Sequence, residues 1–157
     1  MKKFELTAEF VTNVFGKKLF RIKALVAFGD VEKGELGGFI EKEDNRSHDG
    51  NAWVYGNAQV SGDARVYGDA RVYGNAQVYG NADYAAVAGF GRYSRTTTFF
   101  RCKDKILRVQ CGCFYGDLAQ FREIVKKTHG DSKYAKEYLA IADLMELHFS
   151  DECGGEQ

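Results

Sequence analysis

The sequence predicts a mainly β chain with some α-helix, built around a parallel β-helix of six-residue repeats. Residues 51–82 repeat the pattern A-x-V-x-G-[ND] at a step of six, and the register holds until the last repeat. Strand side chains alternate between faces, so the Ala and Val of each repeat share one small apolar face. Each Gly then precedes Asn or Asp, which suit positive φ and turn the chain. Such short strands bury their Val only when coils stack.

Composition and charge narrow the function classes. The 157 residues are 45% hydrophobic, which suits one compact unit or two small ones. Lys plus Arg equals Asp plus Glu at 22 each, so no overall field favours nucleic acid or an anionic membrane. No apolar run reaches membrane-spanning length, and the start has no unbroken apolar segment, so we expect a cytoplasmic protein.

Residues 1–50 are expected to form an N-terminal β-hairpin and the start and cap of the first coil. Two strand-like segments flank Gly16 and Lys17, and a glycine-rich segment leads toward the repeats. An open coil end is an unpaired strand edge, so repeat proteins need such a cap. Arg46 stands where an apolar residue is expected before the first coil.

Residues 51–91 are expected to form the β-helix itself. The alternation places Val54, Val60, Val66, Val72 and Val78 inside, and it places Trp53, Arg65 and Arg71 outside. A hairpin meander needs longer strands than this step allows, and the glycine-rich Ca²⁺ roll has a different period. Both alternatives are therefore less favoured than the β-helix.

Residues 92–150 are expected to form a ββαα unit. Two β-prone segments flank Lys103 to Lys105, which predicts a hairpin. Asp117 with Gln120 three residues later forms a capping box that opens a helix, and Gly130 closes it. A second helix begins at about Ser132. Residues 151–157 are expected to be a flexible tail.

The repeat pattern resembles the hexapeptide family, and the resemblance extends over most of the chain. The segments "LFRIKAL", "FGDVEKGELGGFIEKEDN", "GNAWVYGNAQV" and "RTTTFF", with the ending that begins "CGCFYGDLAQF", are similar to hexapeptide-repeat proteins of phages and prophages. These proteins are often labelled hypothetical or polymer-forming, and their role is poorly defined. The resemblance implies a left-handed β-helix in which three repeats make one triangular coil of about 18 residues. It also implies a homo-oligomer, with a trimer favoured.

At that spacing, residues 18 apart stack into columns. Tyr55 would lie over Tyr73, Trp53 over Arg71, and Gln59 over Gln77. The columns pack on the rest of the chain or on a second subunit, or they offer a ligand platform. Because interface cores favour Tyr, Trp and Arg, the face with Trp53, Tyr55, Arg71 and Tyr73 is the expected subunit contact.

No catalytic residues, metal or cofactor are expected. Hexapeptide acyltransferases use a His near a subunit boundary, but no His lies between residues 51 and 91. Cys102, Cys111 and Cys113 lack the C-x-x-C turn of structural zinc sites, so buried thiols are favoured. An acyltransferase and a structural self-assembling protein remain the alternative functions.

Arginines interleaved with tyrosines favour a binding function. Guanidinium groups and ring faces suit a phosphorylated base or an acidic protein surface, although a solvated coil face has the same composition. Given the phage resemblance, we expect a non-catalytic protein that binds or sequesters a host target, such as a defence protein or its nucleotide signal. Tyr93 belongs to the same pattern. The candidate binding residues are Trp53, Tyr55, Arg65, Tyr67, Arg71, Tyr73, Tyr79, Arg92 and Arg95.

Overall fold

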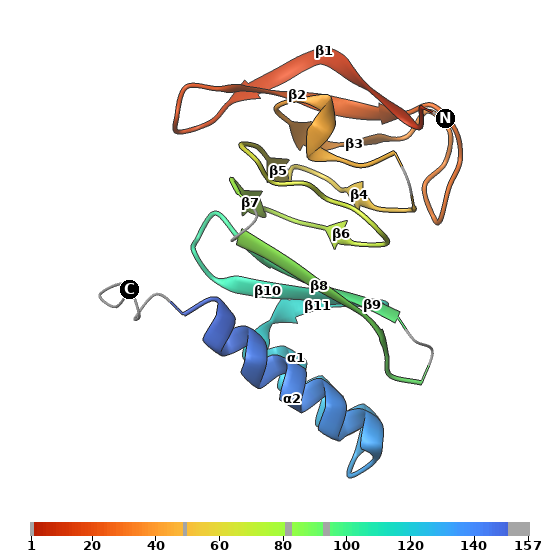
Figure 1. The fold of residues 1–157 in the computed structure, drawn as a ribbon, viewed down its shortest axis with the longest axis vertical. Helices are drawn as coiled ribbons and strands as arrows, with labels where there is room; N and C mark the ends of the chain where they lie inside the picture. Colours follow the sequence, from red (N-terminus) through yellow and green to blue (C-terminus); the bar gives the residue numbers. More distant parts are fainter. Residues whose placement is uncertain (1, 49, 81–82, 93–94, 151–157) are drawn as a thin grey trace.

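A computed structural model describes residues 2–48, 50–80, 83–92 and 95–150. The elements are stacked along the long axis of the molecule (Figure 1). The N-terminal strands lie at one end, the short repeat strands lie in the middle, and a four-stranded sheet with two helices lies at the other end. No helix in the described ranges is long and apolar enough to cross a membrane. The predicted tail at 151–157 falls outside the described residues.

The N-terminal sheet begins with an antiparallel hairpin. Strands β1 (Phe4–Thr12) and β2 (Lys18–Ala24) pair on either side of a turn in which Gly16 has φ +79°. This confirms the two predicted strands. Strand β3 (Leu36–Ile40) joins β2 in antiparallel, and β5 (Gln59–Val60) and β7 (Gln77–Val78) follow in parallel. The result is a mixed five-stranded sheet in the order β1-β2-β3-β5-β7.

The remaining repeat strands form a small parallel sheet of their own. Strands β4 (Trp53–Val54) and β6 (Arg71–Val72) pair so that Trp53 lies opposite Arg71. Gln59 lies opposite Gln77 in the larger sheet, and the rings of Tyr55 and Tyr73 are 4.3 Å apart. These three pairs of neighbours are the ones that the 18-residue spacing predicts.

The predicted fold class, a left-handed parallel β-helix with an N-terminal strand cap and a C-terminal ββαα unit, is nevertheless wrong. The described strands belong to separate mixed, antiparallel and parallel sheets rather than to one solenoid. Strands of two residues provide few ladder hydrogen bonds, so longer strands determine how the sheets are built. Strands β5 and β7 extend a sheet that the N-terminal hairpin starts, and the chain after β7 enters an antiparallel sheet.

That antiparallel sheet has four strands in the order β11-β10-β9-β8. Its strands are β8 (Tyr84–Phe90), β9 (Arg95–Arg101), β10 (Leu107–Cys111) and β11 (Phe114–Asp117). The β9–β10 pairing confirms the hairpin predicted around Lys103 to Lys105. Helices α1 (Leu118–His129) and α2 (Lys133–His148) follow, and the predicted caps at Asp117 and Ser132 are confirmed.

Two hydrophobic clusters lie on opposite faces of the antiparallel sheet. One fills the space among the N-terminal and repeat strands and reaches Phe100, and the other, which includes Phe99, lies beneath the helices. The five repeat valines at positions 54, 60, 66, 72 and 78 are all completely buried, as predicted. The sheet is therefore a central layer that offers one face to the repeats and the other to the helices.

Trp53 is not outward-facing as predicted, because it is completely buried. The loop after β2 folds over it, and the Phe28 ring meets it edge-on with centroids 5.4 Å apart. Arg46, unexpected before the first repeat, is buried beside it. The Arg46 guanidinium lies over the rings of Phe4, Phe28 and Trp53 and donates to the carbonyl oxygens of Ser47 and Ala52.

Candidate ligand-binding cavity

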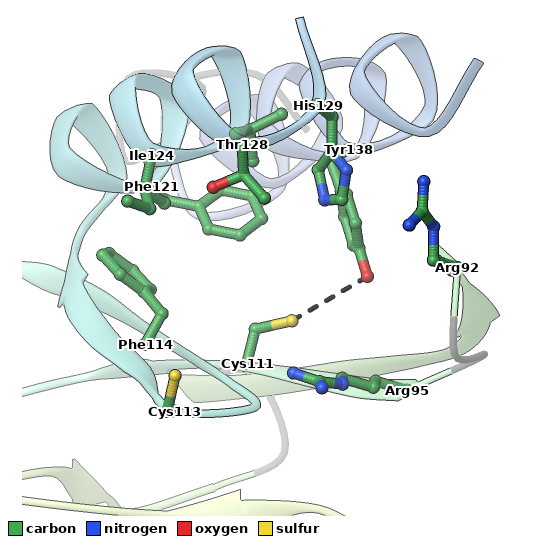
Figure 2. Close-up of a pocket in the computed structure, with 11 residues that line it drawn as sticks. Arg92, Arg95, Cys111, Cys113, Phe114, Phe121, Ile124, Thr128, His129 and Tyr138 are labelled. Atoms are coloured by element: carbon green, nitrogen blue, oxygen red, sulfur yellow. Dashed lines mark hydrogen bonds between the residues drawn. The ribbon is translucent and has the colours of Figure 1, made fainter. Parts of the chain in front are cut away.

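A cavity of about 230 Å³ lies between the central sheet and α1 (Figure 2). Its apolar lining comes from Phe114 on β11 and from α1. Its polar lining comes from the end of the sheet that holds the β8–β9 and β10–β11 turns, from the last turn of α1 and from α2. Figure 2 shows Arg92 and Arg95 on the side opposite Phe114 and Ile124. The lining residues are Arg92, Arg95, Cys111, Cys113, Phe114, Phe121, Ile124, Val125, Thr128, His129 and Tyr138.

The capping box of α1 fixes the apolar side of this cavity. The backbone NH of Gln120 donates to Asp117 Oδ1 at 2.8 Å, and the backbone NH of Asp117 donates to Gln120 Oε1 at 2.9 Å. Because the capping box fixes the first turn of α1, it also fixes which face of the helix points toward the sheet. Phe121 and Val125, which are four residues apart, lie on that face and are both buried. The Phe121 ring meets Tyr138 of α2 edge-on with centroids 5.8 Å apart, which ties the two helices together.

Tyr138 forms the polar end of the cavity. Its hydroxyl donates to the carbonyl oxygen of Phe90 at 3.2 Å. The Cys111 thiol donates to the same hydroxyl at 3.9 Å, a contact that Figure 2 marks with a dashed line. Thr97 Oγ1 donates to Cys111 Sγ at 3.2 Å. Burial first, and the Cys111 thiol second, raises the pKa of Tyr138 to about 12, so the phenol is neutral at physiological pH. The His129 ring stacks on Tyr138 with centroids 5.8 Å apart.

Two glycines make room for the polar side chains of the cavity. Gly112 has φ +60°, and a Cβ at that position would overlap the Arg95 guanidinium. Gly91 has φ +83°, and a Cβ there would overlap the Tyr138 hydroxyl. Larger residues are disfavoured at both positions by the backbone conformation and by the lack of space. The local sequence thus places Arg95 and Tyr138 side by side.

The two cavity arginines are held differently. The Arg92 guanidinium lies over the Tyr134 ring at 5.9 Å from its centroid. Arg95 is the first residue of β9, and it lines this cavity and a second hollow beside it. A planar guanidinium offers several NH donors in a fork, which matches the oxygens of a carboxylate or a phosphate. One side of an otherwise apolar cavity is therefore equipped for an anion.

The second hollow measures about 560 Å³ and lies between the repeat strands and the central sheet. Two of its lining residues interact, since Arg71 Nη1 lies 3.4 Å from Asp30 Oδ2. Tyr55, which is not a lining residue, donates from its Oη to Asp30 Oδ1 at 2.8 Å. Burial and the hydrogen bond to Asp30 raise the pKa of Tyr55. The hollow is lined by Gly29, Asp30, Asn51, Asp69, Arg71, Arg95, Thr96, Gln110, Gly112 and Cys113.

The predicted binding residues are only partly gathered at these two sites. Arg92 and Arg95 line the cavity, Arg71 and Arg95 line the hollow, and the Tyr55–Tyr73 pair lies next to Asp30.

The other candidates lie elsewhere. Trp53 is buried in the core, Arg65 and Tyr67 are exposed on the repeats, and Tyr79 packs against Phe15 with ring centroids 5.2 Å apart. Tyr93 lies outside the described residues. The interleaved Arg–Tyr pattern is therefore not one continuous face.

Several cavity residues were not predicted as part of a site. Phe121 lies on the buried face of α1, Tyr138 lies on the buried face of α2, and His129 is the last residue of α1. Cys111 and Cys113 were predicted to be buried thiols, but Cys111 is half-buried and Cys113 is exposed, while Cys102 is buried. The C-x-C spacing was the available signal, since it surrounds the glycine that accommodates Arg95. Among the described residues, no group of three or more His, Cys, Asp or Glu side chains is placed to hold a metal ion.

Comparison with known proteins gives one family match. A family described as YdcK beta solenoid repeat matches residues 58–74 and 64–80. The match supports a β-solenoid repeat protein family for the repeat segment, and it does not reach the cavity beneath α1. A comparison with curated proteins finds no match.

Proposed function

We propose that the protein binds, without catalysis, a small ligand that combines an aromatic or apolar body with a phosphate group. The observation that carries this proposal is the cavity beneath α1, where Phe114, Phe121 and Ile124 form apolar walls and Arg92 and Arg95 lie on one side. Ligand sites typically combine apolar walls with a few polar groups that fix orientation. Guanidinium groups beside aromatic rings suit a phosphorylated ring system.

The size and charge of the cavity narrow the ligand further. Its volume of about 230 Å³ is smaller than the roughly 300–1,000 Å³ of typical ligand pockets, so it holds one ring system rather than a complete large ligand. The lining residues include two arginines and no carboxylate. An anionic group at the arginines is therefore attracted and meets no opposing acidic side chain among the lining residues.

The polar groups of the cavity support binding rather than chemistry. Cys111 accepts from Thr97 and donates to Tyr138, and Tyr138 in turn donates to a backbone carbonyl, so these groups are hydrogen-bonded to one another. The raised pKa of Tyr138 makes its phenol a poor base at neutral pH. In the phage setting that the sequence resemblance implies, the ligand would be a nucleotide signal of the host, and binding would sequester it.

Titration calorimetry with phenyl phosphate tests the proposal, because this probe carries one ring and one phosphate. We expect Arg92→Gln and Arg95→Gln each to weaken binding about tenfold, which corresponds to about 1.4 kcal/mol. The matched control is Arg65→Gln, at an exposed repeat position outside the cavity, and it should bind like the parent. Melting of each variant without ligand separates lost binding from lost folding.

Three results would contradict the proposal. One is a parent protein that does not bind phenyl phosphate at millimolar concentration, and another is that the two cavity variants bind as well as the Arg65→Gln control. Release of phenol from the bound probe would contradict the non-catalytic part.

A further inference from the structure

We infer that the polar hollow beside the cavity binds the sugar hydroxyls of the same ligand, which makes that ligand a nucleoside phosphate. The inference rests on the proposed function and deepens it. Its starting point is that the hollow and the cavity are neighbours: Arg95 and Cys113, which lies in the turn between β10 and β11, border both. A ligand that occupies both spaces therefore extends around this end of the sheet, past Arg95.

Strand alternation explains why two different sites meet at this point. In the central sheet, Gln110 pairs with Thr98, and Thr98 accepts a hydrogen bond from the Arg71 backbone NH on the repeat side. The next residue, Cys111, pairs with Thr97 and lines the cavity on the helix side. Two successive residues of β10 thus line different spaces: Gln110 lines the polar hollow, and Cys111 lines the apolar cavity.

Gln110 supplies the observation that points to a ligand. Its side chain is only 2% exposed, and its Nε2 donates to the Gly112 carbonyl oxygen at 2.7 Å. Its Oε1, in contrast, has no hydrogen-bond partner among the described residues. Most buried polar atoms in folded proteins have a partner, and leaving an acceptor unpaired is unfavourable. A ligand hydroxyl in the hollow would supply the missing donor.

The charges around the hollow favour hydroxyl groups over a second anion. Arg71 and Arg95 are donors, while Asp69 and Gln110 Oε1 are acceptors, and Asp30 already bonds Tyr55 and faces Arg71. Asp69 Oδ1 accepts a hydrogen bond from the Asn51 backbone NH at 3.3 Å. A hydroxyl both donates and accepts, so it suits this mixed lining, whereas a phosphate would meet the carboxylate of Asp69.

The two sites together describe one ligand class. A base enters the apolar cavity against Phe114 and Phe121, the phosphate lies at Arg95, and the ribose hydroxyls reach Asp69 and Gln110 in the hollow. The hollow, at about 560 Å³, is large enough for a sugar that the smaller cavity excludes.

Three probes separate the two sites: phenyl phosphate, adenosine 5′-monophosphate, and its 2′,3′-dideoxy form. We expect the dideoxy nucleotide to bind about tenfold more weakly than adenosine monophosphate. Gln110→Leu and Asp69→Asn should each weaken adenosine monophosphate by a similar factor and leave phenyl phosphate unchanged. Gln59→Leu is the matched control, since Gln59 also has a buried Oε1 without a partner in the described ranges but lies outside the hollow.

The outcomes distinguish this inference from the proposed function. If phenyl phosphate binds and the two nucleotides bind equally well, the hollow is not a sugar site, while the cavity proposal stands. If phenyl phosphate does not bind the parent, the proposed function fails and the inference fails with it. If both hollow variants weaken all three probes to the same extent, the hollow supports the shape of the cavity only, and the inference is overturned.

Discussion

Individual residues illustrate two ways in which this chain buries polar groups. Arg46 is surrounded by aromatic rings and bonded to carbonyl oxygens, and burial lowers its pKa to about 10, so it remains charged at neutral pH. Tyr138 instead stays neutral and joins a short chain of hydrogen bonds from Thr97 through Cys111 to Phe90. Arg46 packs against Trp53 in the core, and Tyr138 lines the cavity.

The raised pKa of Tyr138 predicts how stability depends on pH. An unfolded Tyr loses its proton near pH 10, whereas Tyr138 in the folded protein keeps it until about pH 12. The stabilisation linked to the protonated Tyr138 phenol is fully present below about pH 10. It is lost as the pH rises through the pKa of Tyr138 in the folded protein. We therefore expect the urea midpoint of the parent to fall more steeply between about pH 10 and about pH 12 than that of Tyr138→Phe. Parallel curves for the two proteins would contradict this.

Elements defined by local sequence were predictable, whereas their assembly into sheets was not. The turn at Gly16, the hairpin around Lys103 to Lys105 and the cap at Asp117 depend on a few neighbouring residues, and all three are confirmed. Each two-residue repeat strand joins a sheet whose other strands are distant in the sequence, and local patterns do not reveal these partners. The predicted fold class was therefore wrong. The cavity depends on the same long-range contacts: of its lining residues, Arg92 and Arg95 were among the predicted binding residues, whereas Phe121 and Tyr138 were not.

The cap of α1 is the local element on which the cavity most depends. Asp117→Ala removes the acceptor of the Gln120 NH, and we expect it to lower the free energy of unfolding by about 1 kcal/mol. Asp131→Ala is the control, because Asp131 is an exposed Asp in the turn after α1. Urea denaturation monitored by circular dichroism measures both. Equal stabilities for the two variants would show that the capping box does not stabilise this helix.

At the scale of the whole molecule, an aromatic row connects the repeats to the central sheet. The ring of Tyr73 lies 4.3 Å from Tyr55 and 6.0 Å from Tyr115, and Tyr115 stacks on Phe100 at 6.2 Å. The column expected as a subunit contact thus packs within the chain at Tyr73, and Trp53 is buried there as well. A homo-oligomer, with a trimer favoured, stays a prediction, and so does its contact surface.

Replacing Tyr73 by Glu tests whether this face packs within its own chain or forms a contact between subunits. A carboxylate between Tyr55 and Tyr115 would lose the ring contacts and be partly desolvated, so we expect Tyr73→Glu to lower the free energy of unfolding by about 2 kcal/mol. Tyr67→Glu is the control, because Tyr67 is 62% exposed and should tolerate the charge with little loss. Light scattering should give both variants the mass of the parent, since Tyr73 packs within its own chain. A Tyr73→Glu protein that keeps the parent's stability but has a smaller mass would instead place this face between subunits.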